Sequence, residues 1–256
     1  MNKKQIIKQN FSRFAGFYDK YSHIQDLSAQ KLLTFLPNSD CKNILDIGCG
    51  TGNYTKLLNE KFPNANITAV DISEKMIKIA RQKLNSNKIV FITADAESIT
   101  FNEKFDLVTS NACFQWFENL SNALKDFTNL LKENGTILFS IFGPKTFYQL
   151  RQSLNQLYKK EHPLTSDFFY NQQQLIELLS KHFDNVFVQQ QLIDYTYSSL
   201  LNLLNTIKYT GTKGLGLNGK TLNKTKLARL ENIYKQNFSE IDTAYQIFYC
   251  SAKKGD

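Results

Sequence analysis

Residues 44–52 combine residue types that could hold a charged ligand. They read Ile-Leu-Asp-Ile-Gly-Cys-Gly-Thr-Gly, a short apolar run followed by glycine at every second position. Gly48, Gly50 and Gly52 let the backbone turn sharply and approach a ligand without interference from a Cβ atom. The spacing differs from the G-x-G-x-x-G that lays a pyrophosphate on a helix N-terminus. Asp46 precedes the glycines, where a carboxylate would repel a phosphate but stabilise an ammonium group.

Polar side chains also follow the next apolar runs along the chain. Asp71 ends the run 67–70, and Asp95 follows the run 89–93 within Thr-Ala-Asp-Ala-Glu. Because ligands of doubly wound sheets bind at the carboxyl ends of strands, these side chains should meet at one rim. We expect Asp71 to accept hydrogen bonds from a ribose diol, and Asp95 to accept one from an adenine amino group. Together with an ammonium site at Asp46, they predict binding of a nucleoside that carries an amino acid, and S-adenosylmethionine fits best.

The elements that must position these residues alternate between strand and helix. This alternation runs from Lys42 to Phe142 and predicts right-handed crossovers and a parallel sheet. Two further strands are expected near residues 185–197 and 243–253, the last as an edge or antiparallel strand. The predicted fold class is therefore α/β, with a seven-stranded, mostly parallel, doubly wound (Rossmann-like) sheet.

Helical patterns flank this core. The N-terminal region predicts two helices, at about residues 4–20 and 25–35, with an aromatic stripe on the first. Segment 198–240 is long for a connection inside a compact domain, and leucines at helical spacing lie on both sides of its glycine-rich turn at 211–219. We expect it to fold as a cap. The expected organisation is a single domain over residues 1–256, with N-terminal lid helices in 1–40, a cofactor-binding core in 42–142 and the cap in 198–240.

Composition limits the function classes. With 256 residues, of which 42% are hydrophobic, the chain can bury one sizeable core. Its four cysteines show no C-x-x-C spacing and its three histidines lie far apart, so we expect no metal site, no disulfide framework and a reducing, cytoplasmic location. The basic N-terminus lacks the apolar stretch of a signal peptide, and no run approaches the ~20 apolar residues needed to span a bilayer.

The net charge of +8 has two interpretations. It can reflect a solvated, lysine-rich surface, or a positive face that attracts an acidic macromolecule such as nucleic acid or acyl carrier protein. No recognisable RNA-binding fingerprint accompanies the basic residues. They concentrate in the last third of the chain, at Lys208, Lys213, Lys220, Lys224, Lys226, Arg229 and Lys235.

Beyond the glycine-rich segment, four stretches resemble one known family. The segment Phe-Ser-Arg-Phe-Ala-Gly-Phe-Tyr-Asp-Lys-Tyr-Ser-His-Ile-Gln (11–25) is similar to the N-terminal signature of the malonyl-acyl carrier protein O-methyltransferases of biotin synthesis. Residues 110–117 (Ser-Asn-Ala-Cys-Phe-Gln-Trp-Phe), 142–150 (Phe-Gly-Pro-Lys-Thr-Phe-Tyr-Gln-Leu) and 207–211 (Ile-Lys-Tyr-Thr-Gly) resemble later segments of these enzymes. The glycine motif resembles that of the wider superfamily, the class I S-adenosylmethionine-dependent methyltransferases.

The resemblance implies methyl transfer from S-adenosylmethionine to the free carboxyl of a malonyl thioester on acyl carrier protein. The methyl ester hides the charged end, so that fatty-acid enzymes can elongate the chain towards pimeloyl. A carboxylate has no proton to lose near neutral pH, and the sequence offers no clear acid–base pair. Catalysis would then come from alignment of the reactants and from fixed hydrogen-bond donors.

The expected site residues fall into two groups. The candidates for the substrate pocket and catalysis are Tyr18, Tyr21, Asn111, Gln115, Trp116 and Lys145. The candidates for cofactor binding are Tyr21, Gln25, Asp46, Gly48, Gly50, Asp71, Ile72, Met76, Asp95, Ala96, Glu97 and Asn111. Lys145 is expected at the start of a helix, an unfavourable place for a cation, which suggests that it meets a substrate carboxylate or a carrier-protein phosphate.

Two alternatives remain at the level of the sequence. One is a small-molecule or quinone methyltransferase of the same fold, and the other is a nucleic-acid-binding protein that keeps the fold. The preferred hypothesis is an enzyme that acts as a monomer with malonyl-loaded acyl carrier protein as its partner, without nucleic acid or membrane.

Overall fold

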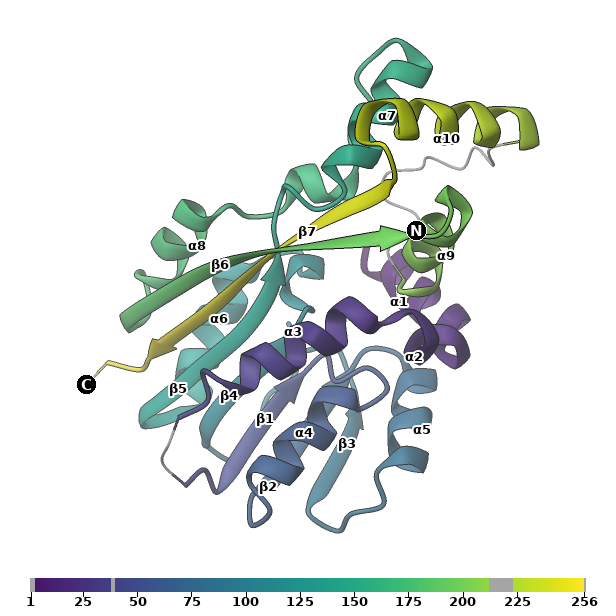
Figure 1. Ribbon diagram of the computed structural model, residues 1–256. Helices are drawn as coiled ribbons and strands as arrows, with labels where there is room; N and C mark the ends of the chain where they lie inside the picture. Colours follow the sequence, from purple (N-terminus) through teal and green to yellow (C-terminus); the bar gives the residue numbers. More distant parts are fainter. Residues whose placement is uncertain (1–2, 38–39, 212–222, 256) are drawn as a thin grey trace.

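The computed structural model describes residues 3–37, 40–211 and 223–255, and contains a seven-stranded sheet in the order β3-β2-β1-β4-β5-β7-β6 (Figure 1). The strands β1 to β5 pair in parallel, whereas β7 pairs antiparallel with both β5 and β6. The predicted α/β fold with a mostly parallel, doubly wound sheet is therefore confirmed. The strands are β1 (Asn43–Ile47), β2 (Asn66–Asp71), β3 (Ile89–Thr93), β4 (Phe105–Asn111), β5 (Leu131–Phe142), β6 (Asp184–Tyr197) and β7 (Ile241–Lys253).

The last strand, β7, lies inside the sheet between β5 and β6, so it is antiparallel but not an edge strand. Its side chains contribute to hydrophobic clusters on both faces, Tyr245 to one and Phe248 to the other. Ile247 pairs with Phe142 at the end of β5. The start of β7 therefore lies at the same edge of the sheet as the carboxyl ends of the parallel strands.

Helices cover both faces of the sheet. The helices α3 (His23–Leu33), α4 (Asn53–Lys61) and α5 (Glu74–Lys83) lie on one face, and α6 (Leu120–Leu130) and α8 (Gln172–Leu179) lie on the other (Figure 1). Neighbouring residues of β1 alternate between the two hydrophobic clusters, with Ile44 under α3 and α4 and Leu45 under α6. Burial on both faces explains why the central strands are continuous apolar runs in the sequence.

The N-terminal segment consists of short helices where one continuous helix over residues 4–20 was expected. The helix α1 (Lys3–Phe14) is followed by the 3-10 turn η1 (Ala15–Phe17) and the single-turn helix α2 (Tyr18–Tyr21). Gly16 lies at the break, and glycine in a helix interior costs about 1 kcal/mol relative to alanine.

Four further helical elements lie beyond the carboxyl ends of the parallel strands (Figure 1). They are α7 (Tyr148–Tyr158), η3 (Thr165–Phe168), α9 (Leu200–Tyr209) and α10 (Lys224–Phe238). In addition, the 3-10 turn η2 (Phe114–Trp116) follows β4. Helices thus occupy both ends of the 198–240 connection, as the leucine spacing predicted. Its glycine-rich turn lies, except for Gly211, outside the described residues, and so do Lys213 and Lys220. Among the described helices, none has the length and apolar character needed to cross a membrane.

Candidate active site

Two adjoining pockets open at the carboxyl edge of the sheet, over β1, β2 and β4. The larger spans about 750 Å³ and the smaller about 340 Å³, in each case including space open to solvent, and they share Tyr18, Gly48, Gly50 and Asn111. The larger pocket is lined by nine of the expected cofactor-binding residues, Gly48, Gly50, Asp71, Ile72, Met76, Asp95, Ala96, Glu97 and Asn111. The smaller pocket adds Gln25 and Asp46. Residues predicted from five separate stretches of sequence are therefore brought together in one place.

The first two glycines of the loop after β1 have different surroundings. Gly48 has φ +72°, and a Cβ there would lie 2.2 Å from the Cys113 sulfur. Gly50 has φ +55° and lines both pockets, and an added Cβ there would lie in open space, more than 4 Å from the side chains and backbone that surround the loop. The expectation that both glycines clear space for the ligand therefore needs correction, because Gly48 makes room for Cys113. Gly50 provides the open cradle.

Asp71 organises this loop from the end of β2. Its carboxylate accepts hydrogen bonds from the backbone N–H of Gly50 at 3.0 Å and of Ser73 at 2.8 Å. Burial raises the pKa of Asp71 to about 6, although these two hydrogen bonds oppose the rise. A carboxylate can accept about four hydrogen bonds, so roughly two acceptor positions remain for a ribose diol.

Asp46 lines the smaller pocket as a buried carboxylate that is only half satisfied. One oxygen accepts a hydrogen bond from the Thr55 hydroxyl at 2.6 Å, whereas Oδ1 has no partner among the described residues. Burial raises the pKa of Asp46 to about 7, and the nearby Asp71 carboxylate adds to the rise. A buried acceptor without a partner is costly, and a ligand ammonium group would satisfy it.

These observations fit S-adenosylmethionine. Its amino-acid end requires a buried acceptor, which Asp46 supplies, and its ribose requires a carboxylate acceptor at the end of β2, which Asp71 supplies. The open space at Gly50 allows the ligand to lie directly against the backbone between them.

The affinity for S-adenosylmethionine should depend on pH through Asp46. The raised pKa of about 7 means that this carboxyl is mostly protonated at pH 6 and mostly ionised at pH 8 in the free protein. Since only the ionised form attracts an ammonium group, the dissociation constant should fall several-fold between pH 6 and 7.5, below the ordinary pKa of an α-amino group at about 8. Calorimetric titration checks this. The Asp46→Asn variant should bind weakly with a flatter profile, and an equal slope in both proteins would assign the titration to another group.

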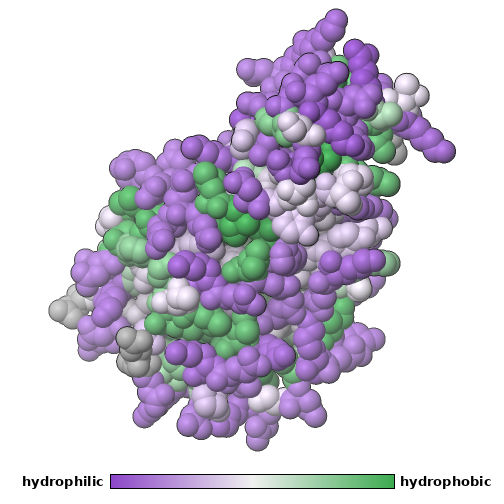
Figure 2. Space-filling view, in the orientation of Figure 1, coloured by the Kyte–Doolittle hydropathy of each residue, from purple (hydrophilic) through white to green (hydrophobic). Residues whose placement is uncertain are grey.

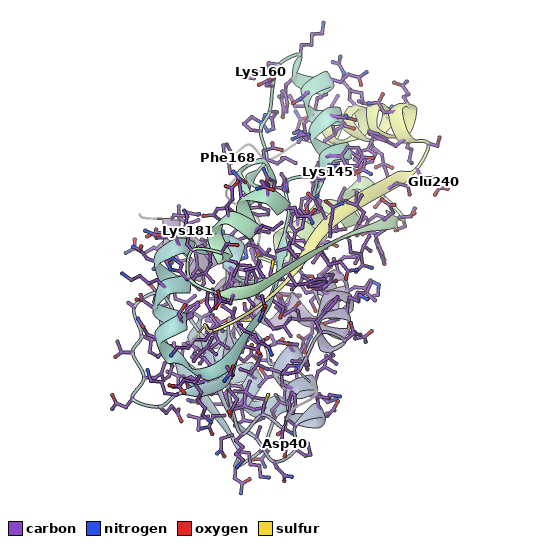
Figure 3. The ribbon with its side chains drawn as sticks, turned by 90° about the vertical axis from the view of Figure 1, so that its left-hand side faces the viewer. Asp40, Lys145, Lys160, Phe168, Lys181 and Glu240 are labelled. Atoms are coloured by element: carbon purple, nitrogen blue, oxygen red, sulfur yellow. The ribbon has the colours of Figure 1, made fainter. Side chains whose placement is uncertain are left out.

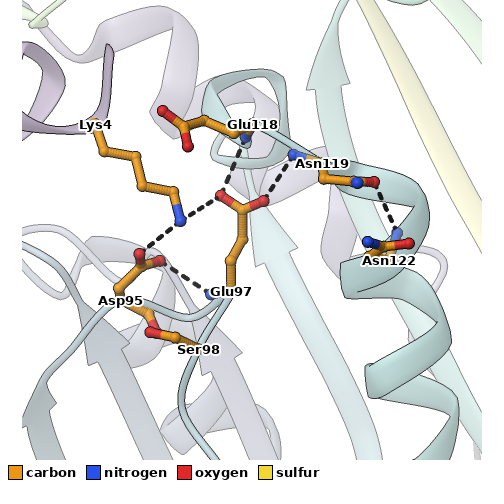
Figure 4. A network of polar contacts seen from close by, with 7 residues as sticks. All are labelled: Lys4, Asp95, Glu97, Ser98, Glu118, Asn119 and Asn122. Carbon is orange, nitrogen blue, oxygen red and sulfur yellow. Dashed lines mark hydrogen bonds and ion pairs between the residues drawn. The ribbon is translucent and has the colours of Figure 1, made fainter. Parts of the chain in front are cut away.

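A charged network closes the other end of the larger pocket (Figure 4). The Lys4 ammonium of α1 lies 2.6 Å from Asp95 and 2.9 Å from Glu97. Burial lowers the pKa of Lys4, but its hydrogen bonds to the two carboxylates outweigh this and raise it above the ordinary value. Glu97 also accepts the backbone N–H groups of Glu118 and Asn119, which precede α6. The network ties α1 to the segment expected to meet the adenine.

The residues expected around the substrate divide into two sets. Tyr18, Asn111 and Trp116 line the larger pocket. Burial raises the pKa of the Tyr18 hydroxyl well above its ordinary value, so this group is neutral near pH 7 and can donate a hydrogen bond. Asn111 donates its amide to the Gln25 carbonyl at 3.0 Å and accepts from the Ser140 hydroxyl at 2.7 Å, which fixes its orientation.

The other three expected residues, Tyr21, Gln115 and Lys145, do not line either pocket. Tyr21 stacks on Tyr209 of α9, with ring centroids 4.7 Å apart. Gln115 is buried and donates its side-chain amide to the Ala112 carbonyl at 2.7 Å. Lys145 is exposed and lies before α7, which begins at Tyr148, so the predicted helix-start position was wrong.

The residues that line the larger pocket without having been predicted as site residues include Lys4, Ile7, Phe11 and Cys113. The first three belong to α1, which carries the aromatic stripe seen in the sequence. Phe11 lies edge-on to Trp116 with ring centroids 6.1 Å apart, and together with Ile7 it forms part of the pocket wall.

Comparison with known proteins agrees with this geometry. The family described as Methyltransferase domain matches residues 45–139, from β1 into β5. An N-methyltransferase of Bradyrhizobium japonicum, solved with S-adenosylhomocysteine, has a TM-score of 0.55 at 13% identity and covers 98% of this chain and 99% of its own. Phosphoethanolamine N-methyltransferase 2 of Haemonchus contortus, solved with S-adenosylmethionine, has a TM-score of 0.59 at 20% identity over 99% of this chain and 58% of its own. Fold and site define a class I S-adenosylmethionine-dependent methyltransferase.

Sequence relatives narrow the assignment. The chain is 35% identical to malonyl-[acyl-carrier protein] O-methyltransferase 2 of Ilyobacter polytropus, over 94% of this chain and 93% of that protein. It is 34% identical to malonyl-[acyl-carrier protein] O-methyltransferase of Acetivibrio thermocellus, over 98% of this chain and 94% of that protein. The chain belongs to the malonyl-[acyl-carrier protein] O-methyltransferase family, which confirms the resemblance found in its sequence.

Proposed function

We propose that this enzyme methylates the free carboxylate of malonyl-acyl carrier protein, giving the malonyl methyl ester that primes pimeloyl synthesis for biotin. The observation that carries the proposal is the match to relatives named for this reaction over more than nine-tenths of the chain. The structure supports it with a pocket whose buried residues suit the amino-acid and ribose ends of S-adenosylmethionine.

The roles of the residues follow from their chemistry. S-adenosylmethionine supplies an electrophilic methyl group when bound. Asp46 holds the ammonium group, Asp71 accepts from the ribose, and Asp95 lies at the adenine end. Tyr18 and Trp116 line the space that remains for the substrate. Since burial also raises the pKa of the Cys113 thiol, both it and the Tyr18 hydroxyl are protonated at neutral pH and act as neutral walls.

We also propose that the described helices within residues 1–40 and within the cap in 198–240, α9 and α10, act as a lid over the cofactor-binding core in 42–142. Three contacts support this. Lys4 bridges α1 to Asp95, Tyr21 of α2 stacks on Tyr209 of α9, and an added Cβ at Gly211 would meet the Phe11 ring at 2.5 Å. Such a lid excludes water from the carboxylate and strengthens its interactions with fixed donors.

A mass-shift assay tests the proposed activity. Purified protein, S-adenosylmethionine and malonyl-acyl carrier protein should yield carrier protein heavier by one methyl group. Acetyl-acyl carrier protein lacks the free carboxylate and should gain none. Methylation of a quinone or another small acceptor, with no product on malonyl-acyl carrier protein, would favour the small-molecule alternative.

The chemical step should need no titrating base. With S-adenosylmethionine at saturation, the single-turnover rate on malonyl-acyl carrier protein should be nearly constant between about pH 6 and 8, because carboxylic acids ordinarily titrate near pH 4. Saturation removes the effect of Asp46 on cofactor binding. A steep rise across this range would instead indicate deprotonation of a phenol or a carbon acid, and would count against a carboxylate as the nucleophile.

A further inference from the structure

Two basic segments that are distant in the sequence lie together in the fold. Lys159 and Lys160 directly follow α7, and the first turns of α10 carry Lys224, Lys226 and Arg229. The two helices lie side by side, with the Lys226 ammonium 5.9 Å from the centre of the Tyr158 ring (Figure 1). We call these five basic residues and the helix faces that bear them the α7–α10 surface.

The charges of this surface are available to a partner. All five side chains are exposed, and none forms an ion pair with a carboxylate in the part of the chain that the structure describes. By contrast, Arg151 of α7 is paired with Asp167, and Lys235 of α10 is paired with Glu231 at 2.8 Å. In Figure 2 the end of the molecule formed by these helices is predominantly hydrophilic. The α7–α10 surface is therefore an unneutralised positive region.

Lys208, which the sequence grouped with these residues, has a different environment. Its ammonium lies over the rings of Phe14 and Tyr209, at 5.5 and 4.7 Å from their centres. It therefore contributes to the contact between α9 and the N-terminal helices.

The α7–α10 surface lies at the same edge of the sheet as the pocket. The helix α7 follows the carboxyl end of β5, and α10 leads into the start of the antiparallel β7. The chain after α7 then returns to the site, where Phe169 lies edge-on to the pocket residue Trp116 with ring centroids 5.8 Å apart. A partner on this surface would therefore lie next to the site where its acyl group must enter.

One exposed aromatic residue lies on this return segment. Phe168 is 77% exposed, although its neighbour Phe169 packs against Trp116. Figure 3 shows Phe168 on the side of the molecule that also carries Lys160 and Lys145. Exposed aromatic side chains often serve as anchors of protein interfaces.

We propose that the acyl carrier protein docks on the α7–α10 surface, with Phe168 as its apolar contact. This inference rests on the proposed function, which requires a partner whose acidic surface complements the free lysines and arginine. Long-range attraction between the two faces would speed the encounter and orient the thioester towards the pocket.

A charge-reversal pair with a matched control tests the proposal. The test variant is Lys160→Glu/Lys226→Glu, and the control is Lys61→Glu/Lys125→Glu, which makes the same charge change at exposed positions on α4 and α6. At low ionic strength, KM and the dissociation constant for malonyl-acyl carrier protein should be about tenfold higher in the test variant than in the wild type. Added salt should reduce this difference between the two proteins. The control should behave like the wild type. Malonyl-pantetheine, which lacks the carrier protein, should be methylated equally by all three.

Phe168→Ala provides an independent test, because the side chain is exposed and its removal leaves no cavity. It should speed dissociation of labelled malonyl-acyl carrier protein several-fold while the affinity for S-adenosylmethionine stays unchanged. Equal carrier-protein binding by the wild type, the double variant and Phe168→Ala would overturn the docking site.

Two further outcomes distinguish failure of the proposed function from failure of the docking site. If the wild type binds malonyl-acyl carrier protein but does not methylate it, the proposed function fails, while weaker binding by the double variant still supports the docking site. Unrelated single-stranded RNA provides the second outcome. If it displaces the carrier protein at equal concentration, and if the double variant loses affinity for RNA as much as for the carrier protein, the surface is a general polyanion site and the inference is wrong.

Discussion

Gly50→Val is expected to abolish binding of S-adenosylmethionine, and Gly50→Ala to weaken it by at least about tenfold. Gly50 has φ +55°, a conformation that costs an L-residue roughly 1–2 kcal/mol. Gly50 lines both pockets, and an added Cβ would lie in open space, so we expect a side chain there to compete with the ligand. Calorimetric titration and thermal unfolding together separate lost affinity from lost stability.

Gly52→Ala is the matched control for the backbone strain. Gly52 also has a positive φ, of +85°, but a Cβ there would meet Leu84 at 3.1 Å and Ala80 at 3.2 Å, away from either pocket. This variant should lose stability more than affinity. Wild-type affinity in a folded Gly50→Val protein would refute the assignment of the loop to the cofactor. Gly48→Val is a poorer probe, because its side chain would first collide with Cys113.

Asp71→Ala is expected to raise the dissociation constant for S-adenosylmethionine by about a hundredfold or more. The carboxylate accepts the N–H groups of Gly50 and Ser73 as well as the expected ribose hydroxyls. Removing it leaves two backbone donors without an acceptor, at about 1–3 kcal/mol for each group that stays buried, and loosens the loop that holds the ligand. Asp71→Asn keeps one acceptor oxygen and should lose less. Both can be measured by calorimetric titration.

Asp106→Ala is the control for this prediction. Asp106 also accepts two backbone N–H groups, from Lys42 at 2.9 Å and from Asn43 at 2.8 Å, but at the start of β1, away from both pockets. It should lower the free energy of unfolding and leave the affinity for S-adenosylmethionine near that of the wild type. An equal loss of affinity in both variants would mean that Asp71 acts only through general stability.

The sequence alone determined the features that depend on local pattern. Continuous apolar runs predicted the buried parallel strands, because helices cover both faces of the sheet. The carboxyl ends of parallel strands meet at one edge, so the order of elements was enough to bring Asp46, Asp71 and Asp95 together. The residues at these strand ends line the two pockets for the same reason.

Only the tertiary structure decided the features that join segments distant along the chain. Lys4 reaches Asp95 across 91 residues, and nothing near either residue in the sequence predicts that pair. The need for glycine at position 48 comes from the Cys113 sulfur. The α7–α10 surface exists because α7, which Lys160 follows, packs beside α10, which carries Lys226. The prediction that Lys145 lies at the start of a helix was wrong, because α7 begins three residues later, at Tyr148. Local spacing fixes which face of an element a side chain occupies, whereas packing between elements fixes what that face meets.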